Sequence, residues 1–159
     1  MSHQELDFSK LDASVIETFK GYFSLEVQIG ETPPPEMYDQ KLVAGLLSVT
    51  AGGEVEAQLV ILFPEDSIFK ILEKNYGVPM FEINEMVTDG VGEITNAVYC
   101  IFKEKLSKGP KKYDLALPNA KVFEGGLGDK APSGEIPFKW YSTSIGNFFA
   151  GLAPVNHLT

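Results

Sequence analysis

The stretch "NEMVTDGVGEITNAVYCIFKEKLSK", residues 84–108, predicts the longest helix of the chain. Asn84 is suited to cap its first turn, and Gly109 with Pro110 marks its end. About 24 residues at about 1.5 Å per residue form a rod of about 36 Å. Apolar residues recur at helical spacing along one side of this rod: Ile83, Val87, Val91, Ile94, Val98 and Ile101. This apolar side predicts where the helix is buried.

Three polar residues, Asp89, Glu93 and Asn96, occupy the opposite side of the predicted helix. Their spacing of i, i+4 and i+7 places them along one face. A carboxylate and a carboxamide held one turn apart can contact a partner and position a water molecule. Contact with solvent alone is the ordinary explanation of such a face. Gly90 and Gly92 argue against it, because each costs about 1 kcal/mol relative to alanine. They indicate either close packing of another element or close approach of a partner.

Helices and strands surround this segment in a repeated order. Residues 12–24, with Asp12 as N-cap, and residues 64–77 predict two further helices. The expected strands are 25–29, 42–49, 55–63, 113–117, 120–123, 136–143 and 146–152, with hairpin turns at 51–53 and 144–146. A helix followed by strands occurs twice, which suggests a weak internal two-fold repeat.

The composition is that of a globular protein without nucleic-acid or membrane partners. The 159 residues are 44% hydrophobic, and we expect one domain spanning residues 1–159. Thirteen basic against 22 acidic residues give a net charge of −9, which repels nucleic acid and anionic membranes. Cys100, the one cysteine, excludes an internal disulfide and favours a reducing compartment. No signal peptide or long apolar run is evident, so a cytoplasmic location is expected.

The polar residues of the long helix follow the spacing D-x-x-x-E-x-x-N, and Pro118 stands 22 residues after Asn96. This arrangement resembles the signature of the CheC/CheX/FliY phosphatases of bacterial chemotaxis, and the chain is similar to CheX-type members. The similarity includes "LLSVTAGGEVEAQLVILFPEDSIFKIL", "NYGVPMFEINEMVTDGVGEITNAVYCIFKEKL" and "LALPNAKVFEGG". It implies an α/β (α+β) fold with pseudo-two-fold symmetry, in which long helices cover a mixed β-sheet.

The resemblance also implies an activity and a set of site residues. Such proteins hydrolyse the aspartyl phosphate of CheY-like response regulators. Asn96 matches the residue that orients the attacking water, and Glu93 matches the one that engages a lysine of the receiver. Asp89 matches a supporting position on the helix face. Pro118 matches the last position of the signature, where it either shapes the strand or loop beside the helix or is an ordinary strand-edge residue. The chain is expected to need no cofactor of its own, since Mg²⁺ belongs to the phosphorylated receiver, and to form a homodimer through sheet edges.

The family often carries a second copy of the motif on its first helix. Glu17 matches the glutamate of that copy, but Lys20 replaces the asparagine and no proline follows at the matching distance. One site per chain is therefore expected. Two other functions stay open: a non-enzymatic module that docks a receiver through the same helix face, and an unrelated α/β domain.

Other reactive residues give weaker candidates. His3 and His157 lack cysteine or acidic neighbours at the spacing of metal ligands. Ser142 and Ser144 lack the histidine and aspartate of a catalytic triad. Cys100, one turn beyond the asparagine, either neighbours the site or, as the more ordinary interpretation, packs against another helix.

Overall fold

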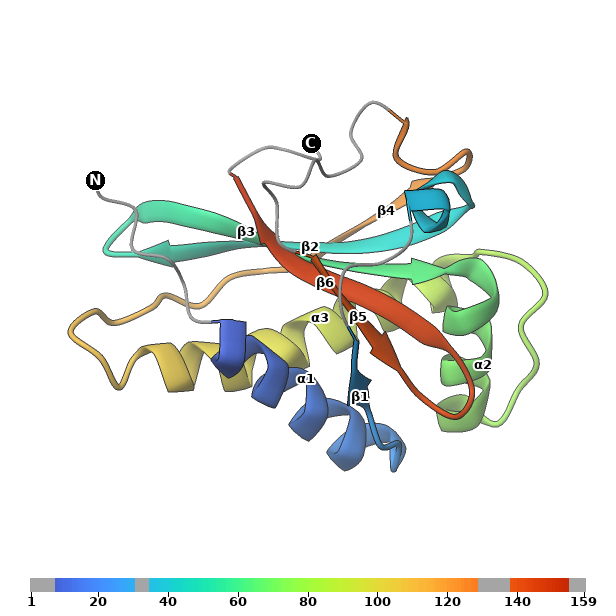
Figure 1. Ribbon diagram of the computed structural model, residues 1–159, viewed down its shortest axis with the longest axis horizontal. Helices are drawn as coiled ribbons and strands as arrows, with labels where there is room; N and C mark the ends of the chain where they lie inside the picture. Colours follow the sequence, from blue (N-terminus) through green and yellow to red (C-terminus); the bar gives the residue numbers. More distant parts are fainter. Residues whose placement is uncertain (1–7, 31–34, 129–137, 155–159) are drawn as a thin grey trace.

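A computed structural model describes residues 8–30, 35–128 and 138–154, and in them three α-helices lie on one face of a β-sheet (Figure 1). The elements are α1 (Phe8–Phe23), β1 (Gln28–Ile29), the 3₁₀ helix η1 (Pro35–Asp39), β2 (Leu42–Ala51), β3 (Glu54–Pro64), α2 (Glu65–Tyr76), α3 (Glu85–Leu106), β4 (Asn119–Phe123), β5 (Phe138–Ser142) and β6 (Asn147–Ala153).

The six strands form one sheet in the order β1-β5-β6-β3-β2-β4. Every described pairing is antiparallel. The predicted α+β class is confirmed, whereas the expected mixture of parallel and antiparallel strands is wrong. Tight hairpins join β2 to β3 and β5 to β6, and a hairpin makes its two strands antiparallel. The two hairpins then meet antiparallel at β3 and β6, in the centre of the sheet.

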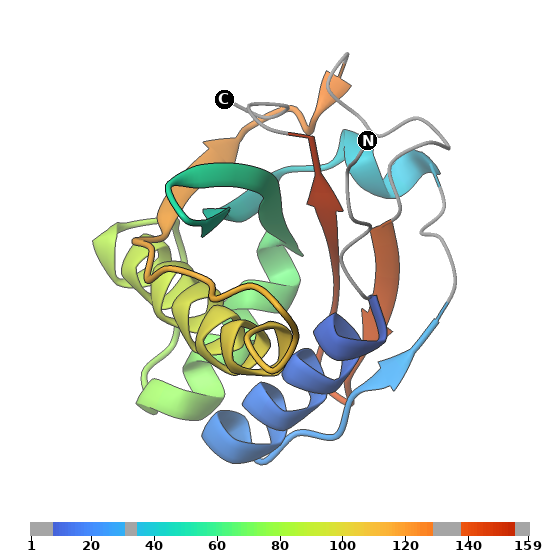
Figure 2. The same ribbon diagram turned by 90° about the vertical axis from the view of Figure 1, so that its left-hand side faces the viewer.

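The topology repeats itself about the centre of the sheet. Exchanging the segment from α1 to β3 with the segment from α3 to β6 replaces β1 by β4, β2 by β5 and β3 by β6. The strand order then reads the same in reverse. The same exchange swaps α1 with α3, and these two helices lie side by side under the sheet (Figure 2). The expected pseudo-two-fold arrangement is therefore present.

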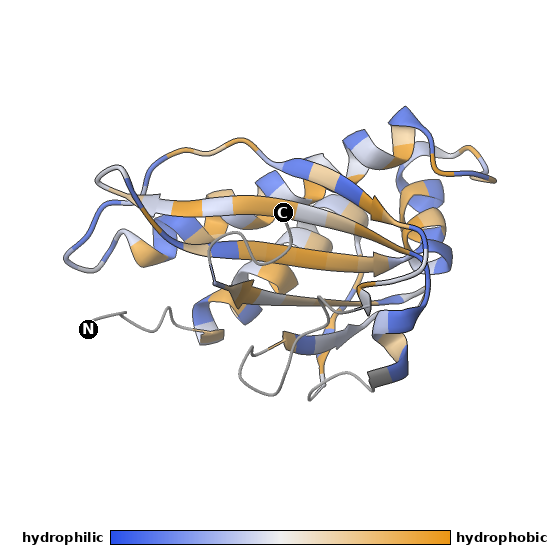
Figure 3. Cartoon of the chain, turned by 90° about the horizontal axis from the view of Figure 1, so that it is seen from above, coloured by the Kyte–Doolittle hydropathy of each residue, from blue (hydrophilic) through white to orange (hydrophobic). Residues whose placement is uncertain are grey.

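Both faces of the sheet are apolar, because its central strands are buried on both sides. On β3, Leu59 and Ile61 pack in the core under the helices, whereas Val60 and Leu62 belong to a second cluster on the other face. Figure 3 shows the apolar strands from that second side. Tyr38 of η1 packs in the second cluster. The sheet is thus the middle layer of the fold.

The helix caps follow the sequence in two of three cases. Asn84 Oδ1 accepts a hydrogen bond from Val87 N at 3.2 Å, which confirms the N-cap of α3. Gly77 ends α2 in the left-handed conformation, with φ of 73°. Asp12 is not an N-cap, because α1 already begins at Phe8. Its carboxylate is buried and accepts hydrogen bonds from Lys139 Nζ and Tyr141 Oη of β5, each at 2.7 Å.

Two expected strands differ in the structure. Residues 25–29 contribute only the two-residue strand β1. The expected strand 113–117 is wrong: Tyr113 forms a single bridge with Ala51, and regular pairing resumes at Asn119. Pro118 has no N–H to donate and cannot continue the strand ladder upstream. The expected start of a strand at residue 136 lies outside the described residues.

Candidate active site

α3 is held unusually close to the sheet at Gly45 of β2. A Cβ atom on Gly45 would overlap Thr95 Oγ1, so a glycine is required at this contact. Thr95 is fully buried, and its hydroxyl donates to Val91 O at 2.8 Å within the helix. The contact fixes the apolar side of α3 against β2. The polar side of the helix therefore faces outward from a rigid support.

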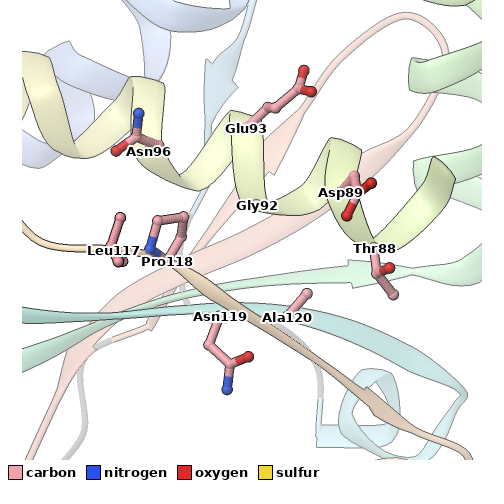
Figure 4. A pocket seen from close by; sticks show the side chains of 9 residues that line it. All are labelled: Thr88, Asp89, Gly92, Glu93, Asn96, Leu117, Pro118, Asn119 and Ala120. Atoms are coloured by element: carbon pink, nitrogen blue, oxygen red, sulfur yellow. The ribbon is translucent and has the colours of Figure 1, made fainter. Parts of the chain in front are cut away.

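The four residues predicted from the sequence line one cleft (Figure 4). Asp89, Glu93 and Asn96 are exposed on α3, and Pro118 stands across the cleft at the entry to β4. The cleft has a volume of about 580 Å³. Its other lining residues are Thr88, Gly92, Leu117, Asn119 and Ala120. The structure thus brings together residues that are far apart in the sequence.

The side chains of Glu93 and Asn96 are available to a partner. Within the described part of the chain, neither has a hydrogen bond or an ion pair with another protein group. A carboxamide can donate and accept at once, and a carboxylate can accept several hydrogen bonds. The pair therefore presents a water-binding group one helical turn from an anionic anchor.

The two glycines of the motif have different roles. A Cβ on Gly90 would lie 2.7 Å from Leu72 Cδ2 and 3.2 Å from Tyr76 Oη. Gly90 therefore allows α2 to pack closely on α3, the first of the two explanations considered for these glycines. A Cβ on Gly92 would meet only Pro118 Cγ, at 3.9 Å, which is an ordinary contact. Gly92 keeps the cleft wall open without being required by packing.

Pro118 ends a segment that lies over α3, residues 114–118, here called the strap. Its first residue is anchored twice: Asp114 O accepts from Tyr99 Oη at 2.6 Å, and Asp114 N donates to Thr50 O at 2.8 Å. Its far end continues directly into β4, where Asn119 pairs with Leu46. The strap is thus fixed at both ends and forms the second wall of the cleft.

The cleft is electronegative. Asp89 and Glu93 contribute two carboxylates, and no lysine or arginine is among the residues that line it. Burial raises the pKa of Tyr76 on α2, and the nearby carboxylates of Glu93 and Asp89 raise it further. This arrangement favours a partner that brings a cationic group.

Several lining residues were missed at the sequence level. Thr88 could have been included, because it lies one turn before Gly92 on the same helix. Leu117 and Asn119 could not, since the strand expected at 113–117 would have placed the strap in the sheet. Cys100 is exposed, so its interpretation as a residue that packs against another helix is wrong. It is also not among the residues that line the cleft.

The other sequence candidates lie elsewhere or outside the description. His3 and His157 are outside the described residues. In the described ranges, no group of three or more His, Cys, Asp or Glu side chains is placed to hold a metal ion. The helices of the same ranges include no candidate for a membrane-spanning segment. On α1, Glu17 forms an ion pair with Lys105 of α3 at 3.2 Å, and Lys20 is exposed.

Comparison with known proteins agrees with the fold. The family model described as chemotaxis phosphatase CheX matches residues 46–132. The chemotaxis protein CheX from Vibrio vulnificus is 25% identical, with a TM-score of 0.75 over 96% of this chain and 98% of that one. A CheC-like superfamily protein from Shewanella sp. PV-4 is 24% identical, with a TM-score of 0.72 over 91% and 94%.

A third similar structure is the CheX-CheY-BeF₃-Mg²⁺ complex from Borrelia burgdorferi. It is 12% identical, with a TM-score of 0.69 over 94% of this chain and 99% of that one, and it supports the fold alone. No curated protein matches the chain. The matched family model spans more than half of the sequence and includes the whole of the cleft. The chain therefore belongs to the chemotaxis phosphatase CheX family.

Proposed function

We propose that this chain hydrolyses the aspartyl phosphate of a CheY-like response regulator. The observation that carries the proposal is the pair Glu93 and Asn96, exposed on α3 at an open cleft and without a side-chain hydrogen bond or ion pair to any described residue. Membership of the chemotaxis phosphatase family supports it. In the Borrelia burgdorferi complex a CheX protein of the same fold is bound to CheY, which is the kind of partner proposed here.

Asn96 orients the attacking water in this proposal. Its carboxamide holds the water in line with the phosphorus atom, and a carboxamide does not act as a base at neutral pH. The water oxygen bonds to phosphorus while the acyl P–O bond breaks, and its electron pair stays on the aspartate carboxylate. The water proton leaves with inorganic phosphate or solvent. Positioning is the main requirement of such a transfer, and Mg²⁺ belongs to the receiver.

The other cleft residues hold the partner. Glu93 pairs with a lysine of the receiver and anchors α3 over the phosphate. Asp89 adds negative charge to the same face, and Pro118 shapes the opposite wall. The outer edges of the described sheet, β1 and β4, leave backbone groups for edge-to-edge pairing, so we also propose a homodimer. A monomeric mass by light scattering at micromolar concentration would contradict the dimer.

Phosphate release from phosphorylated receivers of the same organism tests the activity. Wild type is expected to accelerate release, and Asn96→Ala to lower turnover at least 100-fold while binding is kept. Glu93→Ala is expected to weaken binding as well. Glu104→Ala, exposed on α3 outside the cleft, is the matched control and should behave as wild type. Binding of the receiver without faster phosphate release would instead favour the alternative function, a non-enzymatic adaptor that docks the receiver through the same helix face.

A further inference from the structure

The strap exposes two leucines beside the proposed site. Leu115 is 80% exposed and Leu117 is 91% exposed. Single exposed apolar side chains are common on proteins, but two of them close together beside a cleft mark an interaction surface. Leu117 lines the cleft itself, and Leu115 stands two residues before it on the same segment. We call these two residues the leucine ridge.

The leucine ridge is held in place. Asp114, directly before it, is bonded to both α3 and β2, and Pro118, directly after it, leads into β4. Ala116, between the two leucines, packs against the main core. With the middle residue turned inward, its two neighbours point outward together. The leucines are therefore presented in a fixed position, which lowers the entropy lost when a partner covers them.

We propose that the leucine ridge docks the phosphorylated receiver and selects among receivers by an apolar contact next to the phosphate. This inference rests on the proposed function. Leu117 and Asn96 line the same cleft, so a macromolecule that delivers a phosphoryl group to Asn96 has to cover Leu117. The matching receiver surface is apolar where it meets the ridge and cationic where it meets Glu93 and Asp89. Receivers with a charged residue facing the ridge are rejected.

Steady-state kinetics with the full chain tests the ridge. Phosphate release is measured as a function of receiver concentration for Leu117→Ser and for Leu115→Ser/Leu117→Ser. We expect KM to rise about 10-fold for the single and about 100-fold for the double variant, with kcat within about twofold of wild type. Leu117→Met, which keeps volume and apolar character, should restore KM. Val78→Ser is the control, because Val78 is 42% exposed in the loop between α2 and α3 and does not line the cleft.

Three results would overturn the inference. An unchanged KM in folded serine variants, with wild type active, would show that the ridge does not dock the receiver. A loss of kcat at constant KM would assign the leucines to the shape of the site. A change of mass by light scattering without a change of KM would assign them to a contact between two copies of the chain.

Failure of the proposed function is distinguishable from failure of the ridge. If wild type releases no phosphate, the enzyme proposal fails, and the ridge is then tested by titration of a BeF₃-treated, Mg²⁺-loaded receiver. In that titration Leu117→Ser should weaken binding about 10-fold, whereas Val78→Ser should not. Equal affinities for wild type and Leu117→Ser would overturn the ridge on its own.

Discussion

The two halves of the molecule share one topology but hold their long helices in different ways. α3 lies so close to β2 that Gly45 has no room for a side chain. α1 instead packs on the sheet through aromatic rings. Phe19 stacks on Phe148 of β6 with 4.5 Å between the ring centroids, and the ring centroid of Phe23 lies 5.4 Å from that of Phe19. The same frame is thus filled by close backbone contact in one half and by large side chains in the other.

The polar side chains of the two helices also differ in whether they have partners within the protein. On α1, Asp12 is bonded to Lys139 and Tyr141, and Glu17 is paired with Lys105. On α3, Glu93 and Asn96 have no protein partner in the described residues. The fold provides two equivalent helices, and on α1 these polar side chains form contacts within the protein. The site therefore depends on side chains that have no partner among the described residues and that stand on a tightly held helix.

The largest effect is expected from a substitution that removes the aromatic contact between α1 and the sheet. Phe19→Ala should lower the free energy of unfolding by about 4 kcal/mol, because it leaves a cavity under a fully buried ring. Urea denaturation measures the loss. Phosphate release per folded molecule should stay at the wild-type level, since α1 carries no site residue. Phe81→Ala, at an 85% exposed position, is the control and should change stability by less than about 0.5 kcal/mol.

The next effect tests the close contact in the other half. Gly45→Ala should lower the free energy of unfolding by about 3 kcal/mol, because the new methyl group overlaps the Thr95 side chain. Thr95→Ala removes the overlapping hydroxyl, so the double variant should lose less than the sum of the two single variants. Strict additivity in urea denaturation would show that α3 is not held by this contact.

Much of the fold could be predicted from the sequence because local signals and packing agree. The hairpin at residues 52–53 uses two glycines with positive φ, of 61° and 82°. The end of α2 at Gly77 and the start of α3 at Asn84 follow their caps. The errors fall where long-range contacts decide the outcome. Asp12 is a residue type that often caps helices, but here its carboxylate is bound by Lys139 and Tyr141 of β5. Strand pairing likewise depends on distant segments and cannot be predicted from one segment alone.

The candidate site was predictable in part for the same reason. Asp89, Glu93 and Asn96 share a face by helical periodicity alone. The far wall of the cleft was not predictable, because the apolar strap reads as a strand. The strap is placed over α3 by the missing N–H of Pro118 and by contacts of distant residues, among them the hydrogen bond from Tyr99. The exposure of Leu117 follows from that displacement.

The anchor of the strap gives a smaller effect that depends on pH. Tyr99→Phe should cost about 1 kcal/mol near pH 8, since Asp114 O loses its hydrogen bond. Burial, and then the charges of Asp114 and Cys100, raise the pKa of Tyr99 to about 12. The protonated phenol is the bonding form, so its contribution is complete below about pH 10 and is lost as the pH rises towards 12. The gap between wild type and Tyr99→Phe in urea denaturation should narrow above pH 10. A gap that is constant from pH 8 to 11 would contradict this assignment.

The two motif glycines should respond in opposite directions to the same substitution. Gly90→Ala should lower the free energy of unfolding by about 1 kcal/mol, because overlap with Leu72 outweighs the gain in helix propensity. Gly92→Ala should raise it by about 0.5–1 kcal/mol, since its Cβ meets only Pro118 at 3.9 Å. Each variant is the control for the other in thermal denaturation. Equal shifts in melting temperature for the two variants would show that Gly90 is not required for packing any more than Gly92 is.

The smallest expected effect is the most direct test of the difference between the halves. Lys20→Asn restores the side chain that α1 lacks, at the position that corresponds to Asn96. We expect no phosphatase activity from Lys20→Asn in an Asn96→Ala background, measured by phosphate release. Glu17 remains paired with Lys105, and no proline follows at the matching distance to form a second wall. Activity regained by this double variant would mean that the asparagine alone makes a site on this fold. Its absence would mean that a free glutamate and an opposing wall are required as well, and only the α3 half has both.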